Sequence, residues 1–81
     1  MTDQEYTQIL TIVVEDTDLS SALEKLTRLH EECNRRTMEY WSGKRTSRSI
    51  QSRKYIAAVN AVCKKFSVDA VYTRNNRYEV K

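Results

Sequence analysis

The sequence predicts a small α+β domain, in which about three antiparallel strands pack against two helices in the order β-α-α-β-β. Three observations support this fold class. Apolar and β-branched side chains alternate over residues 5–15, as in a half-buried strand. Two longer segments repeat apolar residues at intervals of three and four, and residues 68–80 have the pattern of a hairpin. Helices covering one face of the sheet are the simplest arrangement of these elements.

With 81 residues, the chain is near the lower limit for a single hydrophobic core. We therefore expect one compact domain over residues 1–81. The acidic start lacks the pattern of a secretion signal, and no apolar stretch approaches the roughly 18 residues of a membrane span. Two cysteines are too few for a disulfide scaffold. These features predict a cytoplasmic protein that has no contact with a membrane.

The predicted first strand covers residues 5–15. Leu10, Ile12 and Val14 alternate on one of its faces. The opposite face is only half apolar, and it carries Thr7, Ile9, Thr11 and Val13. Such a face suits either a central strand or a docking surface. It is the candidate surface for a homodimer formed through the first strand.

The first helix is predicted from about Leu19 to about Trp41. Acidic residues at 15, 16 and 18 supply candidate caps at its start, and Gly43 supplies the left-handed residue that ends many helices. Its apolar stripe consists of Leu19, Ala22, Leu23, Leu26, Leu29 and Cys33. The second helix begins within residues 44–54 and extends to about Phe66. Its predicted apolar face consists of Tyr55, Ile56, Val59, Val62, Cys63 and Phe66.

Residues 68–80 are predicted to form a hairpin whose two-residue turn is Asn75-Asn76, because asparagine tolerates positive φ. This register places Arg74 opposite Arg77, where like charges are unfavourable unless they face solvent or an anion. The inner face would carry Val71, Thr73, Tyr78 and Val80, and the outer face Tyr72, Arg74, Arg77 and Glu79. The order of helix, basic turn, helix and hairpin is also found in winged helices, although one short helix of that fold is not evident.

The distribution of charge is strongly asymmetric. Residues 1–33 carry eight acids against two bases, whereas residues 34–55 carry seven bases against one acid. The stretch from 44 to 54 holds five bases and no acid, and hydroxyl residues stand where the second helix is expected to begin. Unpaired backbone N–H groups at a helix start, surrounded by cations, are a candidate site for an anion. An anionic partner is therefore expected.

Enzymatic function is not indicated. The only histidine, His30, and the two cysteines cannot supply the four ligands of a structural zinc site, and no second histidine is present. A chain with one glycine has no glycine-rich phosphate loop and no nucleophile elbow. We expect a non-catalytic protein without a cofactor.

Two binding functions remain. The first is binding of nucleic acid, with DNA and RNA both open, through the helix start and the outer face of the hairpin. The candidate site residues are Lys44, Arg45, Ser47, Arg48, Ser49, Arg53, Lys54, Tyr72, Arg74 and Arg77. Trp41, Tyr40 and Tyr55 are further stacking candidates, and the sequence leaves open whether Trp41 and Tyr55 are core or surface. The alternative is a regulator or inhibitor module that binds a protein partner, such as a phage or mobile-element accessory protein acting on a host complex.

Overall fold

The computed structural model describes residues 1–81 as three α-helices, two short 3-10 helices and a two-stranded antiparallel sheet. The mixed α+β composition is confirmed. The predicted number of strands and the β-α-α-β-β order are wrong, because the first element is a helix. The elements are α1 (Asp3–Ile12), η1 (Val13–Glu15), α2 (Leu19–Trp41), η2 (Ser47–Ser49), α3 (Ser52–Phe66), β1 (Ala70–Tyr72) and β2 (Tyr78–Val80).

Residues 5–15, which were predicted to form a strand, belong to α1 and η1. Thr2 caps the helix by accepting a hydrogen bond from the Glu5 backbone N–H at 3.2 Å and donating one to the Glu5 carboxylate at 3.2 Å. The first bond satisfies one backbone donor of the helix start, and the second joins the two side chains. Tyr6, Leu10 and Val13 are all buried, and their spacing of four and three residues places them on one helical face. Capping and burial outweigh the β propensity of the threonine, isoleucine and valine residues.

α2 spans the predicted residues, Leu19–Trp41. Asp18 caps it by accepting from the Ser21 N–H at 3.0 Å. At the other end Gly43 has φ +84, with its N–H bonded to the Tyr40 carbonyl and the Lys44 N–H bonded to the Glu39 carbonyl. This is the Schellman motif, which uses a left-handed residue to satisfy the last carbonyls of a helix.

α3 begins at Ser52, after Gln51 adopts a left-handed conformation with φ +51. The basic stretch is therefore mostly a loop containing η2, and only its last residues are helical. Ala58 and Val62 are buried in the core, but Ile56 is 56% exposed. The prediction that Ile56 lies on the apolar face is wrong.

The hairpin pairs Tyr72 with Tyr78 and Val71 with Glu79, so the predicted register is wrong by one residue. Its loop has three residues, because the Thr73 N–H bonds to the Arg77 carbonyl at 2.9 Å. Asn76 has φ +58, the left-handed position that typically ends such a loop. Arg74 lies in this loop and does not stand opposite Arg77.

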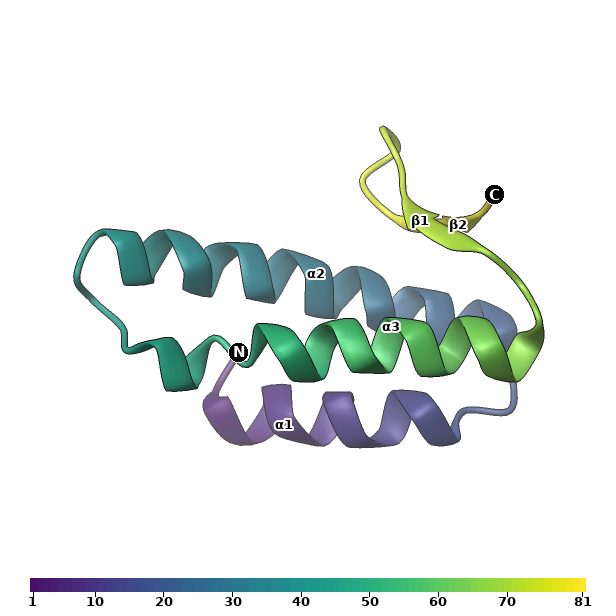
Figure 1. Ribbon diagram of the computed structural model, residues 1–81, viewed down its shortest axis with the longest axis horizontal. Coiled ribbons are helices and arrows are strands. Elements are labelled where there is room, and N and C mark those ends of the chain that lie inside the picture. The colour runs from purple at the N-terminus through teal and green to yellow at the C-terminus, as the bar shows by residue number, and fades with distance from the viewer.

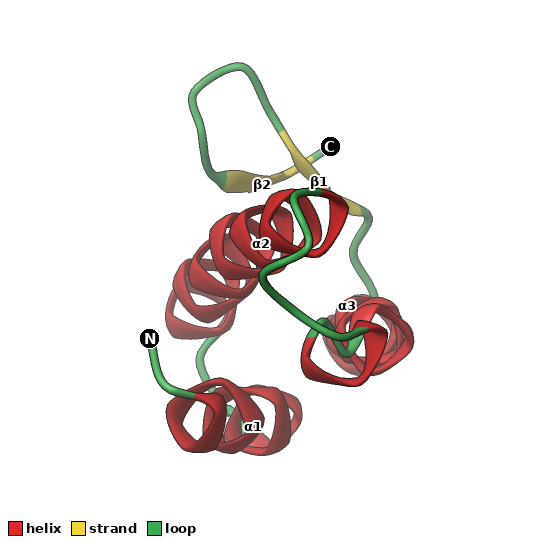
Figure 2. Cartoon of the chain, turned by 90° about the vertical axis from the view of Figure 1, so that its left-hand side faces the viewer, coloured by secondary structure: helices red, strands yellow, loops and turns green.

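The three helices lie side by side, with α1 and α3 running in the same direction and α2 opposite to both (Figure 1). The hairpin packs on α2, on the side away from α1 (Figure 2). Because α2 and α3 are antiparallel neighbours, they do not cross steeply as in a helix-turn-helix. None of the helices combines the length and apolar character needed to cross a membrane. The core consists of Tyr6, Leu10, Val13, Ala22, Leu26, Leu29, Ala58, Val62, Ala70 and Tyr78.

Candidate nucleic-acid interface

The segment that joins α2 to α3 is held in place by the core. Ile50 is buried, and the Tyr6 hydroxyl donates a hydrogen bond to the Ile50 carbonyl at 3.0 Å. Arg36 also donates to the Ser49 carbonyl. These contacts give a defined shape to a loop that the sequence marks only by its charge.

Arg36 is fully buried, and its guanidinium lies 4.4 Å from the centre of the Tyr6 ring. It donates to Glu32 at 3.0 Å and to Asp3 at 2.7 Å. Hydrogen bonding from Arg36 holds the pKa of Asp3 below its usual value. Burial acts to raise the pKa of Glu32, but hydrogen bonds from Arg35 and Arg36 outweigh it, so that this pKa is also lowered. The carboxylates are therefore charged partners of a buried cation.

Sequence reasoning missed this buried ion-pair network, although a signal was present. Arg36 follows Leu26, Leu29 and Cys33 at helical spacing, so it continues the apolar stripe of α2. A charged residue in such a stripe needs a partner within the fold. Glu32, four residues earlier, is the nearest candidate.

Arg45, one of the predicted site residues, is also engaged within the fold. It donates to Glu39 at 3.0 Å and to Asp3 at 3.3 Å, and its side chain is 20% exposed. Ser49 similarly donates its hydroxyl to the Thr46 carbonyl at 2.9 Å. Both residues thus have structural contacts that compete with a ligand.

Four other cations of the stretch are exposed and form no ion pair in the structure. We call Lys44, Arg48, Arg53 and Lys54 the basic cluster. Three of them border a hollow of about 590 Å³ at the start of α3. The residues lining this hollow are Ser47, Arg48, Gln51, Ser52, Arg53 and Lys54.

Backbone N–H donors lie at the start of α3, beside the same hollow. Tyr55 is the first residue of α3 whose N–H bonds to a preceding carbonyl, that of Gln51 at 3.1 Å. The N–H groups of Ser52, Arg53 and Lys54 have no such carbonyl, as expected for a first helical turn. With the positive end of the helix dipole, they favour an anion. Cations, hydroxyls and amide donors therefore meet in one hollow.

The predicted hairpin residues do not join the basic cluster. The hairpin lies at one end of the molecule, and the loop before α3 lies at the other (Figure 1). Tyr72 faces α2 and stacks on His30 with ring centres 3.7 Å apart, so its predicted place on the outer face is wrong. Arg77 pairs with Glu79 at 3.1 Å. Arg74 is exposed in the loop and forms no ion pair.

Two further stacking candidates, Tyr55 and Trp41, lie in different surroundings. The Tyr55 hydroxyl bonds to His30 Nδ1 at 3.1 Å and to the Tyr78 hydroxyl. Burial and the bond to Tyr78 raise the pKa of Tyr55, so it is a neutral residue of the core boundary. Trp41, in contrast, is 80% exposed at the end of α2. No group of three or more histidine, cysteine, aspartate or glutamate side chains has an arrangement that could hold a metal ion.

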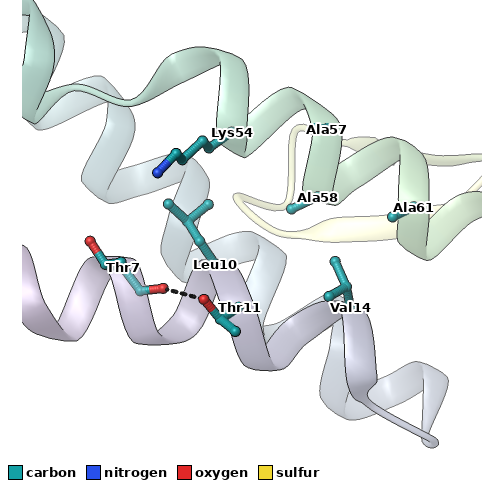
Figure 3. A pocket seen from close by; sticks show the side chains of 8 residues that line it. All are labelled: Thr7, Leu10, Thr11, Val14, Lys54, Ala57, Ala58 and Ala61. Carbon is teal, nitrogen blue, oxygen red and sulfur yellow. Dashed lines mark hydrogen bonds between the residues drawn. The ribbon is translucent and has the colours of Figure 1, made fainter.

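A second hollow of about 480 Å³ lies between α1 and α3 (Figure 3). We call it the α1–α3 groove. Leu10, Val14 and three alanines give it an apolar lining, and Lys54 stands at one end of it (Figure 3). The residues that line it are Thr7, Leu10, Thr11, Val14, Lys54, Ala57, Ala58 and Ala61. Thr7 and Thr11 were predicted to lie on the outer face of a strand, and that strand does not exist.

Fold and site together define a small three-helix protein with a C-terminal hairpin and a cationic hollow at the start of its last helix. Comparison of the chain with protein-family models, with curated proteins and with solved structures finds no match. Its function must therefore be argued from its own residues.

Proposed function

We propose that this is a small, non-catalytic cytoplasmic protein that binds nucleic acid, DNA or RNA, through the basic cluster. One observation carries the proposal. Three exposed cations without acidic partners, Arg48, Arg53 and Lys54, border the hollow at the start of α3, where backbone N–H groups are unpaired. A nucleic-acid backbone needs this combination, because its phosphates are neutralised by lysine and arginine and accept hydrogen bonds from hydroxyl and amide donors.

The division of the basic residues supports the proposal further. Arg35, Arg36 and Arg45 neutralise carboxylates within the fold. The cations of the basic cluster lack such partners, so binding an anion does not require breaking an ion pair. An anion bound there would gain both the charge interaction and the helix dipole.

The test is fluorescence anisotropy of labelled DNA and RNA oligonucleotides, titrated with the protein at several salt concentrations. We expect affinity to fall steadily with salt, and the double variant Arg48→Ala with Arg53→Ala to reduce the log–log slope by about 1.4–1.8. Arg28→Ala is the matched control, because Arg28 is exposed but pairs with Glu24 at 3.8 Å. No binding at low salt, or equal binding by the double variant, would contradict the proposal.

The α1–α3 groove favours a second candidate, a regulator or inhibitor that binds a protein partner. Its small apolar side chains leave room for a partner's amphipathic helix. An acidic docking face at Asp16 and Asp18 is less favoured, because Asp16 pairs with Lys25 and Asp18 caps α2. A second copy of the chain is the other occupant to consider.

Affinity capture with the wild type and with Ala61→Arg tests this candidate, since the arginine would fill the groove. A partner that is held by the wild type and lost by the variant supports the groove. Equal capture by both proteins contradicts it. Sedimentation of the two proteins without a partner identifies self-association through the same face.

A further inference from the structure

Trp41, the last residue of α2, is 80% exposed, and Met38, three residues earlier, is 73% exposed. Side chains at this spacing are neighbours on a helix surface, so the two residues form one exposed apolar patch. Tyr40 contacts the indole edge-on, with ring centres 5.5 Å apart and an interplanar angle of 70°. The indole is thereby supported on one side and accessible to a ligand.

The same turn that ends α2 connects Trp41 to the basic cluster. The Lys44 N–H is bonded to the Glu39 carbonyl at 2.8 Å, and the Gly43 N–H to the Tyr40 carbonyl at 3.0 Å. Trp41 and Lys44 are therefore carried by one hydrogen-bonded turn. The chain then continues into η2, which carries Arg48 at the same end of the molecule (Figure 1).

We infer that Trp41 is a stacking platform for an unpaired base, and that the ligand of the basic cluster is single-stranded nucleic acid. The inference rests on the proposed function. A single strand offers a phosphate chain and accessible base faces together, which matches cations beside an exposed indole. In a duplex the base faces are already stacked on one another, so a duplex could use the cations but not the tryptophan.

The chain has one tryptophan, so its fluorescence reports directly on this residue. The experiment titrates the protein with oligo(dT), oligo(U) and a duplex of equal length. We expect both single strands, or one of them, to quench Trp41, and the duplex to bind without quenching. A comparison of oligo(U) with oligo(dU), which differ only in the 2′-hydroxyl, identifies the preferred sugar.

Variants of Trp41 separate the contribution of base stacking to affinity from that of charge. Trp41→Ala should lower single-strand affinity roughly 5- to 150-fold, the equivalent of one stacked base, and leave duplex affinity unchanged. Trp41→Phe should retain most of the affinity. Ile56→Ala is the matched control, because Ile56 is also an exposed apolar residue, on α3, and should change nothing.

The outcomes distinguish this inference from the proposed function. Equal, unquenched binding of single strands and duplex would overturn the stacking role and leave the basic cluster as a phosphate site. Fluorescence that changes with protein concentration alone would assign the patch to self-association and overturn the inference. No binding of any oligonucleotide at low salt would overturn both.

Discussion

The Arg36 guanidinium lies 2.7 Å from the Asp3 carboxylate, across 33 residues of sequence. Through this contact the C-terminal half of α2 is joined to the first turn of α1. Arg36 also bonds to the Ser49 carbonyl, so one buried side chain connects three segments of the chain. The loop that carries Lys44 and Arg48 is consequently held by an internal ion-pair network.

Arg36→Ala should destabilise the protein by about 3–5 kcal/mol, because it leaves a cavity in the core and removes one of the two cations bonded to buried Glu32. Urea denaturation followed by circular dichroism measures this. If the variant does not fold, Arg36→Lys keeps the charge, loses the planar fork, and should give a smaller loss. Arg35→Ala is the control, since its side chain is 47% exposed. Equal stabilities of the Arg36 and Arg35 variants would contradict the network.

Arg45 and Arg48 are close in sequence, but we expect their variants to behave differently. Arg45→Ala removes the contacts to Glu39 and Asp3 and should lower the urea midpoint. Arg48→Ala removes an unpaired exposed cation and should lower nucleic-acid affinity and its salt dependence without lowering the midpoint. Parallel denaturation and anisotropy measurements on both variants test this. The reverse pattern would remove Arg48 from the site.

The sequence predicted some elements well because their signals are local. Both ends of α2 were correct, since Asp18 and Gly43 act within a few residues of the helix. α1 was missed because threonine, isoleucine and valine favour strands when they alternate. Only the Thr2–Glu5 pair and the spacing of Tyr6, Leu10 and Val13 indicated a helix. The hairpin register failed because two asparagines do not distinguish a two-residue loop from a three-residue one.

The candidate site, too, could be predicted only where the signal is local. Charge located the cations of residues 44–54, but which of them are free depends on contacts between distant residues. Arg45 finds Asp3 across 42 positions, and no local pattern announces that pairing. The separation of the hairpin from the basic cluster likewise follows from helix packing and not from residue type.

Ser67→Gly should stabilise the protein by about 1 kcal/mol. Ser67 follows α3 with φ +54, and the Val68 N–H closes the turn on the Cys63 carbonyl at 3.0 Å. A side chain in this left-handed conformation is strained, and glycine is not. Ser42→Gly is the matched control, because Ser42 has φ −86 and should lose stability instead. Thermal unfolding measures the stability of both variants. A gain of stability in both would contradict a strained, left-handed Ser67.

The docking of the hairpin should weaken in mild acid. His30 stacks on Tyr72, contacts the Tyr55 hydroxyl through Nδ1 and faces the Asn34 side-chain nitrogen, 3.3 Å away, through Nε2. Tyr78 lies edge-on to the ring at 6.1 Å. Burial lowers the pKa of His30, and the nearby Glu31 carboxylate only partly offsets this. The folded protein therefore favours the neutral imidazole.

Because the folded pKa is below the unfolded value of about 6.5, the full contribution of neutral His30 to stability is present above pH 6.5. It is lost as the pH falls from there through the folded pKa, since the unfolded chain binds the proton more readily. NMR titration of the single histidine should give a midpoint below 6.5. Hydrogen exchange of the hairpin amides, corrected for the intrinsic effect of pH, should show less protection at pH 5.5 than at pH 7.5.

His30→Gln is the control for this titration, because it keeps a polar side chain and removes the ionisation. Between pH 7.5 and 5.5 histidine is the side chain whose ordinary pKa lies in the range, so the stability of this variant should be nearly constant. The wild type should lose stability over the same interval. A His30 midpoint at or above 6.5, or an equal pH dependence in both proteins, would contradict a partly buried, neutral imidazole beneath the hairpin.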